Sequence, residues 1–162
     1  MQKTHEALKP LTWLIGRWVS INAAVAYPTM KPVTYCEEVT YESLGQPLLN
    51  YQSRSCHPDS GEPIHIERGF LRIKPGTNQV AFMIAHNLGA VSLEEGCVQD
   101  KEITFKSTSA NIYSMSFVRE PKVLGLERII TLKEDGTLET VLSMQTEKTP
   151  MTEHTYSILK KC

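Results

Sequence analysis

The histidines are the side chains in this sequence best suited to chemistry, and His154 occupies an unusual place among them. Imidazole is the commonest metal ligand in proteins and also serves as an acid or a base. His154 lies in PMTEHTYSILKK (150–161), where apolar and polar residues alternate as in a β-strand. Strict alternation puts Thr152, Tyr156 and Ile158 on its face. Such a histidine is either a buried structural residue or a ligand in a pocket.

The other histidines form no local metal-binding motif. No HxxxH or HxH pair occurs, so spacing along the chain does not support a multi-histidine zinc site. His57 lies in a turn-rich segment, where we expect it in solvent. His65 and His86 fall in strand-like segments, and we interpret both as residues of the core or of its rim.

Sequence motifs for the common catalytic nucleophiles and phosphate-binding loops are absent. There is no GxSxG, no GxxxxGK(S/T) and no GxGxxG. The acidic pairs Glu37-Glu38 and Glu94-Glu95 are adjacent in strand-like segments, so each pair sends its carboxylates to opposite faces. They are poor candidates for a catalytic pair of acids.

Composition favours one folded domain over residues 1–162. Hydrophobic residues make up 41% and charged residues 22%, and the net charge of -1 gives no support for a nucleic-acid partner or a membrane surface. No apolar run approaches the roughly 18 residues of a membrane span, and MQKTHEALKP lacks an apolar signal region. The four cysteines are widely spaced without a CxxC, which favours reduced thiols in a cytoplasmic or nuclear protein.

Strand-like segments that could position these side chains follow one another along almost the whole chain. Short turns separate them, including HPDSGEP (57–63), PGTN (75–78) and Asp135-Gly136. The exception is a short helix or turn near Ala7–Gly16, where Pro10 limits its length. The predicted strands are 33–44, 48–56, 64–74, 79–87, 90–98, 102–110, 114–121, 126–134, 137–146 and the tail after Pro150.

About ten strands joined by short turns predict an all-β, ten-stranded antiparallel up-and-down β-barrel, because closure removes exposed strand edges. A barrel of that size can enclose a ligand. Trp18, in LTWLIGRWVS, is predicted to plug one end of the barrel. Thr29, in AYPTMKP, lies between two prolines in the following loop and offers one hydroxyl.

An ordered set of segments resembles the nitrobindin family. They are LTWLIGRW, AYPT, GQPLLNY, HPDSGEPIHIERGFLRIKPGTNQVAF, NLGAVSLEEG and PMTEH. The resemblance covers nearly the whole chain, and it is strongest to the nitrobindin domain at the C-terminus of a vertebrate THAP-domain-containing protein. Ser20 and Asn22 depart from it, since other members have glycines at those positions.

The resemblance implies a barrel similar in shape to fatty-acid-binding proteins, with one ferric haem b in its mouth. It implies His154 as the axial ligand of the haem iron and Thr29 as a haem contact. It further implies an enzyme, a peroxynitrite isomerase that also binds nitric oxide. On the other side of the iron, His86 is the one protein candidate that the sequence suggests.

Two other classes of function stay open at the level of sequence. The barrel could carry a small apolar ligand without chemistry, or it could be an interaction domain without a cofactor. A homodimer through a barrel face is compatible with the pattern. We predict that three inward rows line the haem slot: Val80/Phe82/Ile84, Leu138/Leu142/Met144 and Tyr156/Ile158.

Overall fold

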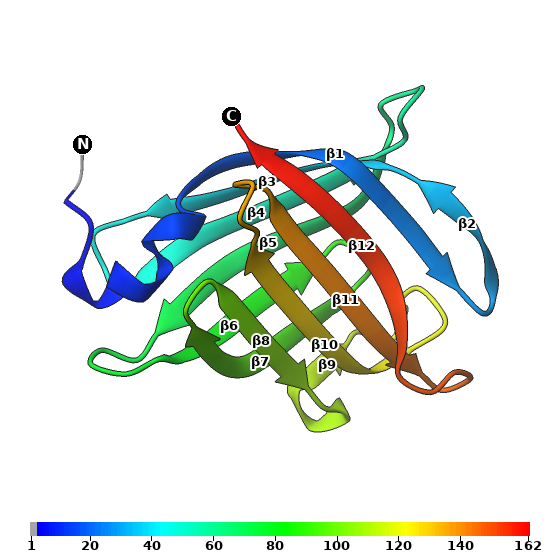
Figure 1. Cartoon of the computed structure of the whole chain (residues 1–162). Helices are drawn as coiled ribbons and strands as arrows, with labels where there is room; N and C mark the ends of the chain where they lie inside the picture. Colours follow the sequence, from blue (N-terminus) through cyan, green and yellow to red (C-terminus); the bar gives the residue numbers. More distant parts are fainter. Residues whose placement is uncertain (1–2) are drawn as a thin grey trace.

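Ten strands form the closed ring of an antiparallel β-barrel in the computed structural model, which describes residues 3–162 (Figure 1). Each strand pairs with the next one in the ring, and the ring closes where β12 pairs with β1. The predicted ten-stranded barrel is confirmed. In chain order the ring contains β1 (Gly16–Tyr27), β3 (Cys36–Ser43), β4 (Leu48–Cys56), β5 (Pro63–Ile73), β6 (Gln79–His86), β7 (Ala90–Gln99), β8 (Glu102–Ser107), β10 (Val123–Leu132), β11 (Leu138–Thr146) and β12 (Thr152–Lys161).

Two short strands lie outside this ring. The strand β2 (Met30–Thr34) folds back on the end of β1, and β9 (Ile112–Ser114) pairs with β7. The sequence predicted one strand over 33–44, but the chain leaves β2 and enters β3 at Tyr35, so that segment supplies two strands. The predicted strand 114–121 is wrong, because residues 115–122 form a loop that bonds to the β6–β7 turn.

A 3₁₀-helical segment, η1 (Glu6–Leu14), covers one end of the barrel (Figure 1, blue). Its apolar residues Leu8, Leu11 and Leu14 are fully buried. The Trp18 side chain is 2% exposed and donates its indole N–H to the carbonyl oxygen of Leu14 at 2.8 Å, which confirms the predicted plug. In the described part of the chain, neither η1 nor the single turn η2 (Ser109–Asn111) is long and apolar enough to cross a membrane.

The end of the barrel opposite η1, here called the mouth, gathers four elements that carry polar side chains. Strands β1 and β6 end there, at Tyr27 and His86, while β5 and β12 begin there. This follows from the antiparallel order, since neighbouring strands run in opposite directions. Residues far apart in the sequence therefore meet at one rim.

An irregularity in β12 decides which way its side chains point. Leu142 of β11 pairs with Thr155, but the next residue, Ser143, pairs with Glu153, so His154 is the extra residue of a β-bulge. A bulge re-aims side chains and breaks strict alternation. The buried residues beyond it are Ser157 and Leu159, at 2% and 0% exposure.

Because of this bulge, β12 buries a different set of side chains from the one that strict alternation predicted. Tyr156 and Ile158 do not share a face with the buried residues of β12, and the Tyr156 hydroxyl instead donates to the Glu139 carboxylate at 3.2 Å. The predicted inward row of Tyr156 and Ile158 is therefore wrong. His154 is nevertheless half-buried. As the extra residue of the bulge, it does not follow the inward and outward alternation of the residues on either side.

Candidate functional site

His154 lies at the mouth with its ring fixed by the neighbouring strand. Its Nδ1 is 3.1 Å from the carbonyl oxygen of Ala26 on β1. A carbonyl only accepts hydrogen bonds, so Nδ1 carries the proton and the lone pair of the neutral ring is on Nε2. Among the described residues, Nε2 has no hydrogen-bond partner.

Tyr27 holds the other side of this imidazole. The rings of Tyr27 and His154 meet edge to face, with centroids 5.0 Å apart. Tyr27 is 6% exposed, and its hydroxyl donates to the carbonyl oxygen of Met144 on β11 at 2.7 Å. Burial lowers the pKa of His154, although the bond to Ala26 opposes the shift, so the ring is neutral at neutral pH.

These features fit an axial ligand for haem iron. A metal-binding imidazole is neutral and donates its second N–H to a carbonyl or carboxylate, which fixes the tautomer and the ring orientation. His154 meets each condition through Ala26 and Tyr27. Its Nε2 is the atom that would hold the iron.

Thr29, the second predicted haem contact, follows shortly after Ala26 and Tyr27, which hold His154. It is exposed in the turn that joins β1 to β2, three residues after Ala26. Among the described residues, no hydrogen bond joins Thr29 to His154. Its role as a haem contact stays a prediction.

The rows predicted to line a haem slot divide between the two ends of the barrel. Val80, Phe82 and Ile84 face inward as predicted, but they are at most 4% exposed and belong to the packed core. Leu138 belongs to the same core, whereas Leu142 and Met144 of that row are half-buried towards the mouth. Only this last pair lies where a ligand of His154 would be.

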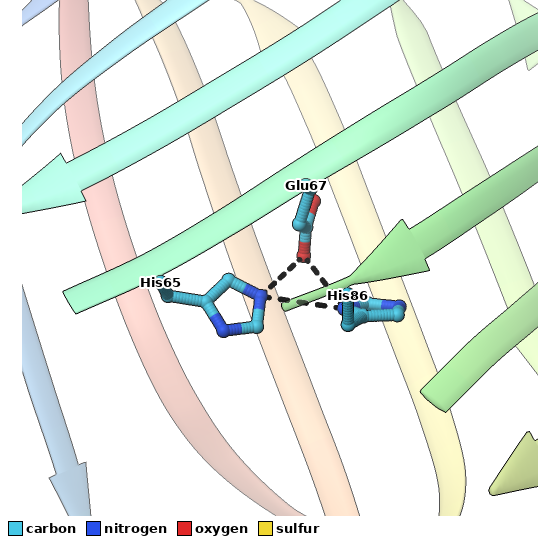
Figure 2. Close-up of side chains that lie close together, drawn as sticks. All are labelled: His65, Glu67 and His86. Atoms are coloured by element: carbon cyan, nitrogen blue, oxygen red, sulfur yellow. Dashed lines mark hydrogen bonds and ion pairs between the residues drawn. The ribbon is translucent and has the colours of Figure 1, made fainter. Parts of the chain in front are cut away.

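A second group of titratable side chains faces into the barrel at the same end. His65 and Glu67 are two residues apart on β5 and share its inward face, while His86 of β6 pairs directly with Glu67. Figure 2 shows the three side chains pointing toward one another. The His65 Nε2 is 3.1 Å from Glu67 Oε1 and 3.3 Å from His86 Nδ1.

Buried partners surround this trio. Arg128 of β10 bridges two carboxylates, with its Nε 2.9 Å from Glu94 Oε1 and its Nη1 3.2 Å from Glu67 Oε2. The Tyr51 hydroxyl donates to Glu67 at 2.7 Å. Burial raises the pKa of the Glu67 carboxyl, but Arg128 and the histidines outweigh it and hold that pKa well below its usual value.

Sequence reasoning missed this group because its members come from different strands. No HxH or HxxxH is present, yet His65 and Glu67 form an H-x-E pair on a strand, which was a usable signal. Placing His86 beside them required the register across the 75–78 turn, where Ile73 pairs with Val80. His86 ends β6 at the mouth, and its 11% exposed side chain faces into the barrel, in line with the expected core or rim position.

Two shallow hollows lie on the outside of the barrel, away from both groups. One is lined by residues around the β7–β8 turn, including Asp100 and Glu102. The other lies over the outer face of β3, β4 and β5, between Glu38 and Arg68. Neither contains His154 or His86.

Comparison with known proteins gives matches along nearly the whole chain. Residues 7–161 match the family model of the THAP4-like, heme-binding β-barrel domain. Peroxynitrite isomerase THAP4 of Homo sapiens is 43% identical over 160 residues, which is 98% of this chain and 27% of the human protein. A protein of Nocardia farcinica named peroxynitrite isomerase is 30% identical and matches 97% of this chain and 92% of its own length.

A solved structure matches the fold over its full length. The crystal structure of Rv2717c from M. tuberculosis has a TM-score of 0.87 at 28% sequence identity and covers 99% of both chains. The chain spans little more than a quarter of the human relative, so the match there is to one region of a longer protein. The resemblance to nitrobindins is confirmed: this chain belongs to the family of THAP4-like, haem-binding β-barrel domains, the nitrobindins.

Proposed function

We propose that this chain binds one ferric haem b in the barrel mouth through Nε2 of His154 and converts peroxynitrite to nitrate. The observation that carries the proposal is the imidazole itself, which is neutral, oriented by the Ala26 carbonyl and unpartnered at Nε2 among the described residues. The names of the human and Nocardia farcinica relatives, both peroxynitrite isomerases, support the choice of substrate.

The residues of the chain have distinct tasks in this proposal. Bound ferric haem would supply a Lewis-acidic iron. His154 would hold the iron, and the Ala26 carbonyl increases the basicity of the ring by accepting its Nδ1–H. Tyr27 limits rotation of the ring from its other side. Leu142 and Met144 offer apolar surface for the macrocycle.

Nitric oxide is a second ligand that we propose for the same iron, on the strength of the family resemblance alone. The reduced cysteines and the cytoplasmic or nuclear location that the composition favours also stay predictions, as do the homodimer and the haem contact of Thr29. None of them alters the role proposed for His154.

A carrier of an apolar molecule is the alternative, and the interior of the barrel argues against it. Glu67, Glu94 and Arg128 are at most 4% exposed and lie inside the barrel, where an apolar chain would have to leave charged groups without water. A flat macrocycle that stays at the mouth does not require that interior.

The proposal is tested by titrating ferric haem into the wild type, His154→Ala and His57→Ala, and following the Soret absorption. His57 is an exposed turn histidine and serves as the matched control. We expect a Soret band in the wild type and the control, and weaker binding with a shifted band in His154→Ala. Equal binding by all three proteins would exclude His154 as the ligand.

Activity is tested separately by mixing peroxynitrite with the haem-loaded wild type in a stopped-flow instrument and measuring nitrate yield. We expect faster decay and more nitrate than in buffer with the haem-free protein. A normal Soret band without faster decay would keep the haem site and exclude the isomerase activity.

A further inference from the structure

The trio formed by His65, Glu67 and His86 has the separations of ligands around one metal ion. Its three donor atoms are 3.1, 3.3 and 3.5 Å apart. Ligands at Zn²⁺ bond lengths of about 2.0–2.1 Å in a tetrahedron are roughly 3.3–3.5 Å from one another. The three donors, which dashed lines join in Figure 2, are therefore spaced like one face of such a tetrahedron.

The tautomer of His86 is set by partners on its far side. Ser92 Oγ donates to Glu94 Oε2 at 3.0 Å, so Ser92 is left to accept from His86 Nε2–H at 2.9 Å. Burial lowers the pKa of His86, although Glu67 opposes this shift. In the neutral ring, the lone pair of Nδ1 therefore faces Glu67 and His65.

That orientation leaves two acceptors, His86 Nδ1 and Glu67 Oε1, facing each other beside His65 Nε2. The His86 Nδ1 lone pair is 3.5 Å from an oxygen of the Glu67 carboxylate, and two lone pairs at that separation repel each other. A single proton on His65 Nε2 can serve only one of them well. A cation between the three donors would satisfy all of them at once.

The charge of the buried groups around the trio also favours a bound cation. Two buried carboxylates, Glu67 and Glu94, share the single guanidinium of Arg128, which leaves one formal negative charge more than positive. Unbalanced charge inside a barrel is costly, and coordination of a metal ion is one of the few ways to balance it. Access exists, because the His65 side chain is 32% exposed.

We propose that His65 Nε2, Glu67 Oε1 and His86 Nδ1 bind one Zn²⁺ ion, with water in the fourth position. Two imidazoles and a carboxylate are a ligand set that proteins use for zinc with an open position. The Ser92–Glu94 pair is then the outer shell that orients His86. This set of ligands shares no residue with the haem site proposed around His154.

The test is calorimetric titration of ZnCl₂ into haem-free protein that has been stripped of metal, with CoCl₂ as a second, absorbing probe. We expect one ion per chain and a visible Co²⁺ band of tetrahedral intensity. His65→Ala is the main variant, because its partly exposed side chain can be removed with little harm to the fold. His86→Ala is the second variant.

Two controls separate this site from the other histidines, and a third variant probes the outer shell. His57→Ala and His154→Ala should keep one Zn²⁺ per chain at wild-type affinity. Ser92→Ala should lose about 10–100-fold in affinity, and the two ligand variants should lose more. Circular dichroism verifies that each variant is folded.

Two results would overturn the proposal. One is the absence of Zn²⁺ and Co²⁺ binding in the wild type, which would make the trio a hydrogen-bonded network that shares one proton. The other is stoichiometric binding that survives in folded His65→Ala and His86→Ala, which would place the ion elsewhere. Haem titration of the same variants shows separately whether the His154 site is intact.

Discussion

Tyr27 is the residue that connects the candidate iron ligand to the barrel wall. It belongs to β1, packs its ring edge-on against His154 of β12 and donates its hydroxyl to the carbonyl of Met144 on β11. Its ring and its hydroxyl therefore have different tasks. The ring positions the imidazole of β12, and the hydroxyl ties β1 to β11 at the mouth.

Substitution of Tyr27 can separate these tasks. Tyr27→Phe should lower the free energy of unfolding by about 0.5–1.5 kcal/mol, since it removes one hydrogen bond, and should leave haem affinity unchanged. Tyr27→Ala should also weaken haem binding by roughly 2- to 10-fold, because the ring no longer packs on His154. Urea unfolding and the Soret titration measure the two effects. Equal loss of haem affinity in both variants would assign the positioning to the hydroxyl instead.

Glu37 gives the interior a pH dependence of its own. Its side chain lines the barrel interior and accepts a hydrogen bond from Ser53 Oγ at 3.1 Å. Burial raises the pKa of this carboxyl above its usual value of 4.5, and hydrogen bonds from Ser157 and Ser53 only partly oppose the shift. The folded state therefore binds a proton more tightly at Glu37 than the unfolded state does.

Because the pKa of Glu37 is raised in the folded state, the stability of the fold falls as the pH rises. Between the unfolded pKa near 4.5 and the higher folded pKa, the folded chain holds more protons, so its free energy of unfolding decreases with increasing pH. The loss of stability caused by Glu37 is absent below this pH interval and complete above it. Glu37→Gln should remove this contribution, so the stability difference between wild type and variant should grow from pH 4.5 upward. A difference that is constant with pH would contradict the raised pKa.

The pairing of β5 with β6 depends on a glycine. Gly69 pairs with Ile84, and a Cβ at this position would overlap the carbonyl oxygen of Met83 on the neighbouring strand. The close approach lies two residues from the Glu67–His86 pair, so it helps to set the register that brings the trio together.

Gly69→Ala should therefore lower the free energy of unfolding by about 3 kcal/mol or more, since two strand backbones must separate. Gly76→Ala is the control. Gly76 has open space around it and a φ of +75°, so strain alone should cost about 1–2 kcal/mol. Urea unfolding measures both, and a loss in Gly69→Ala no larger than in the control would show that β5 and β6 can adjust.

The strands themselves were predictable from the sequence, and the exceptions have physical reasons. Alternation and turn residues located nearly every strand, including the hairpin at Asp135-Gly136, where Gly136 has a φ of +83°. Residues 114–121 alternate like a strand, but Met115 and Phe117 are 48% and 80% exposed in a loop. Alternation predicts a strand only where a neighbouring strand is free to pair.

The candidate sites were less predictable, since they depend on register and on a bulge. The family resemblance pointed to His154, but strict alternation gave it the wrong neighbours, because one unpaired residue shifts the phase of β12. The sequence offered His65, Glu67 and His86 as separate residues. Only the pairing of β5 with β6 brings them together.

Arg128 acts at the scale of the whole barrel, because it links strands that are not neighbours. It lies on β10 and bonds to Glu67 of β5 and Glu94 of β7, all at most 4% exposed. Its guanidinium also lies 5.4 Å from the centre of the Phe82 ring, at the top of the apolar core. The interior is thus tied across its width as well as around its wall.

Arg128→Ala should lower the free energy of unfolding by about 3–5 kcal/mol, because two carboxylates would stay buried without their partner. Arg17→Ala is the control, since Arg17 pairs with Glu38 at 2.8 Å on the exposed outer surface and should change stability far less. Urea unfolding of both variants gives the comparison. Similar losses of unfolding free energy in the two variants would mean that water reaches the interior ion pairs as it does the surface pair.

The strands that close the barrel, β1 and β12, come from the two ends of the described chain, with Trp18 paired to Lys161. Contacts between residues so distant in sequence form slowly, because a long loop must close first. Ala26 belongs to β1 and His154 to β12, so the imidazole finds its carbonyl partner only once this seam has formed. Haem capture is thereby coupled to the order of folding, and the Soret band of a refolding sample reports the moment at which the barrel closes.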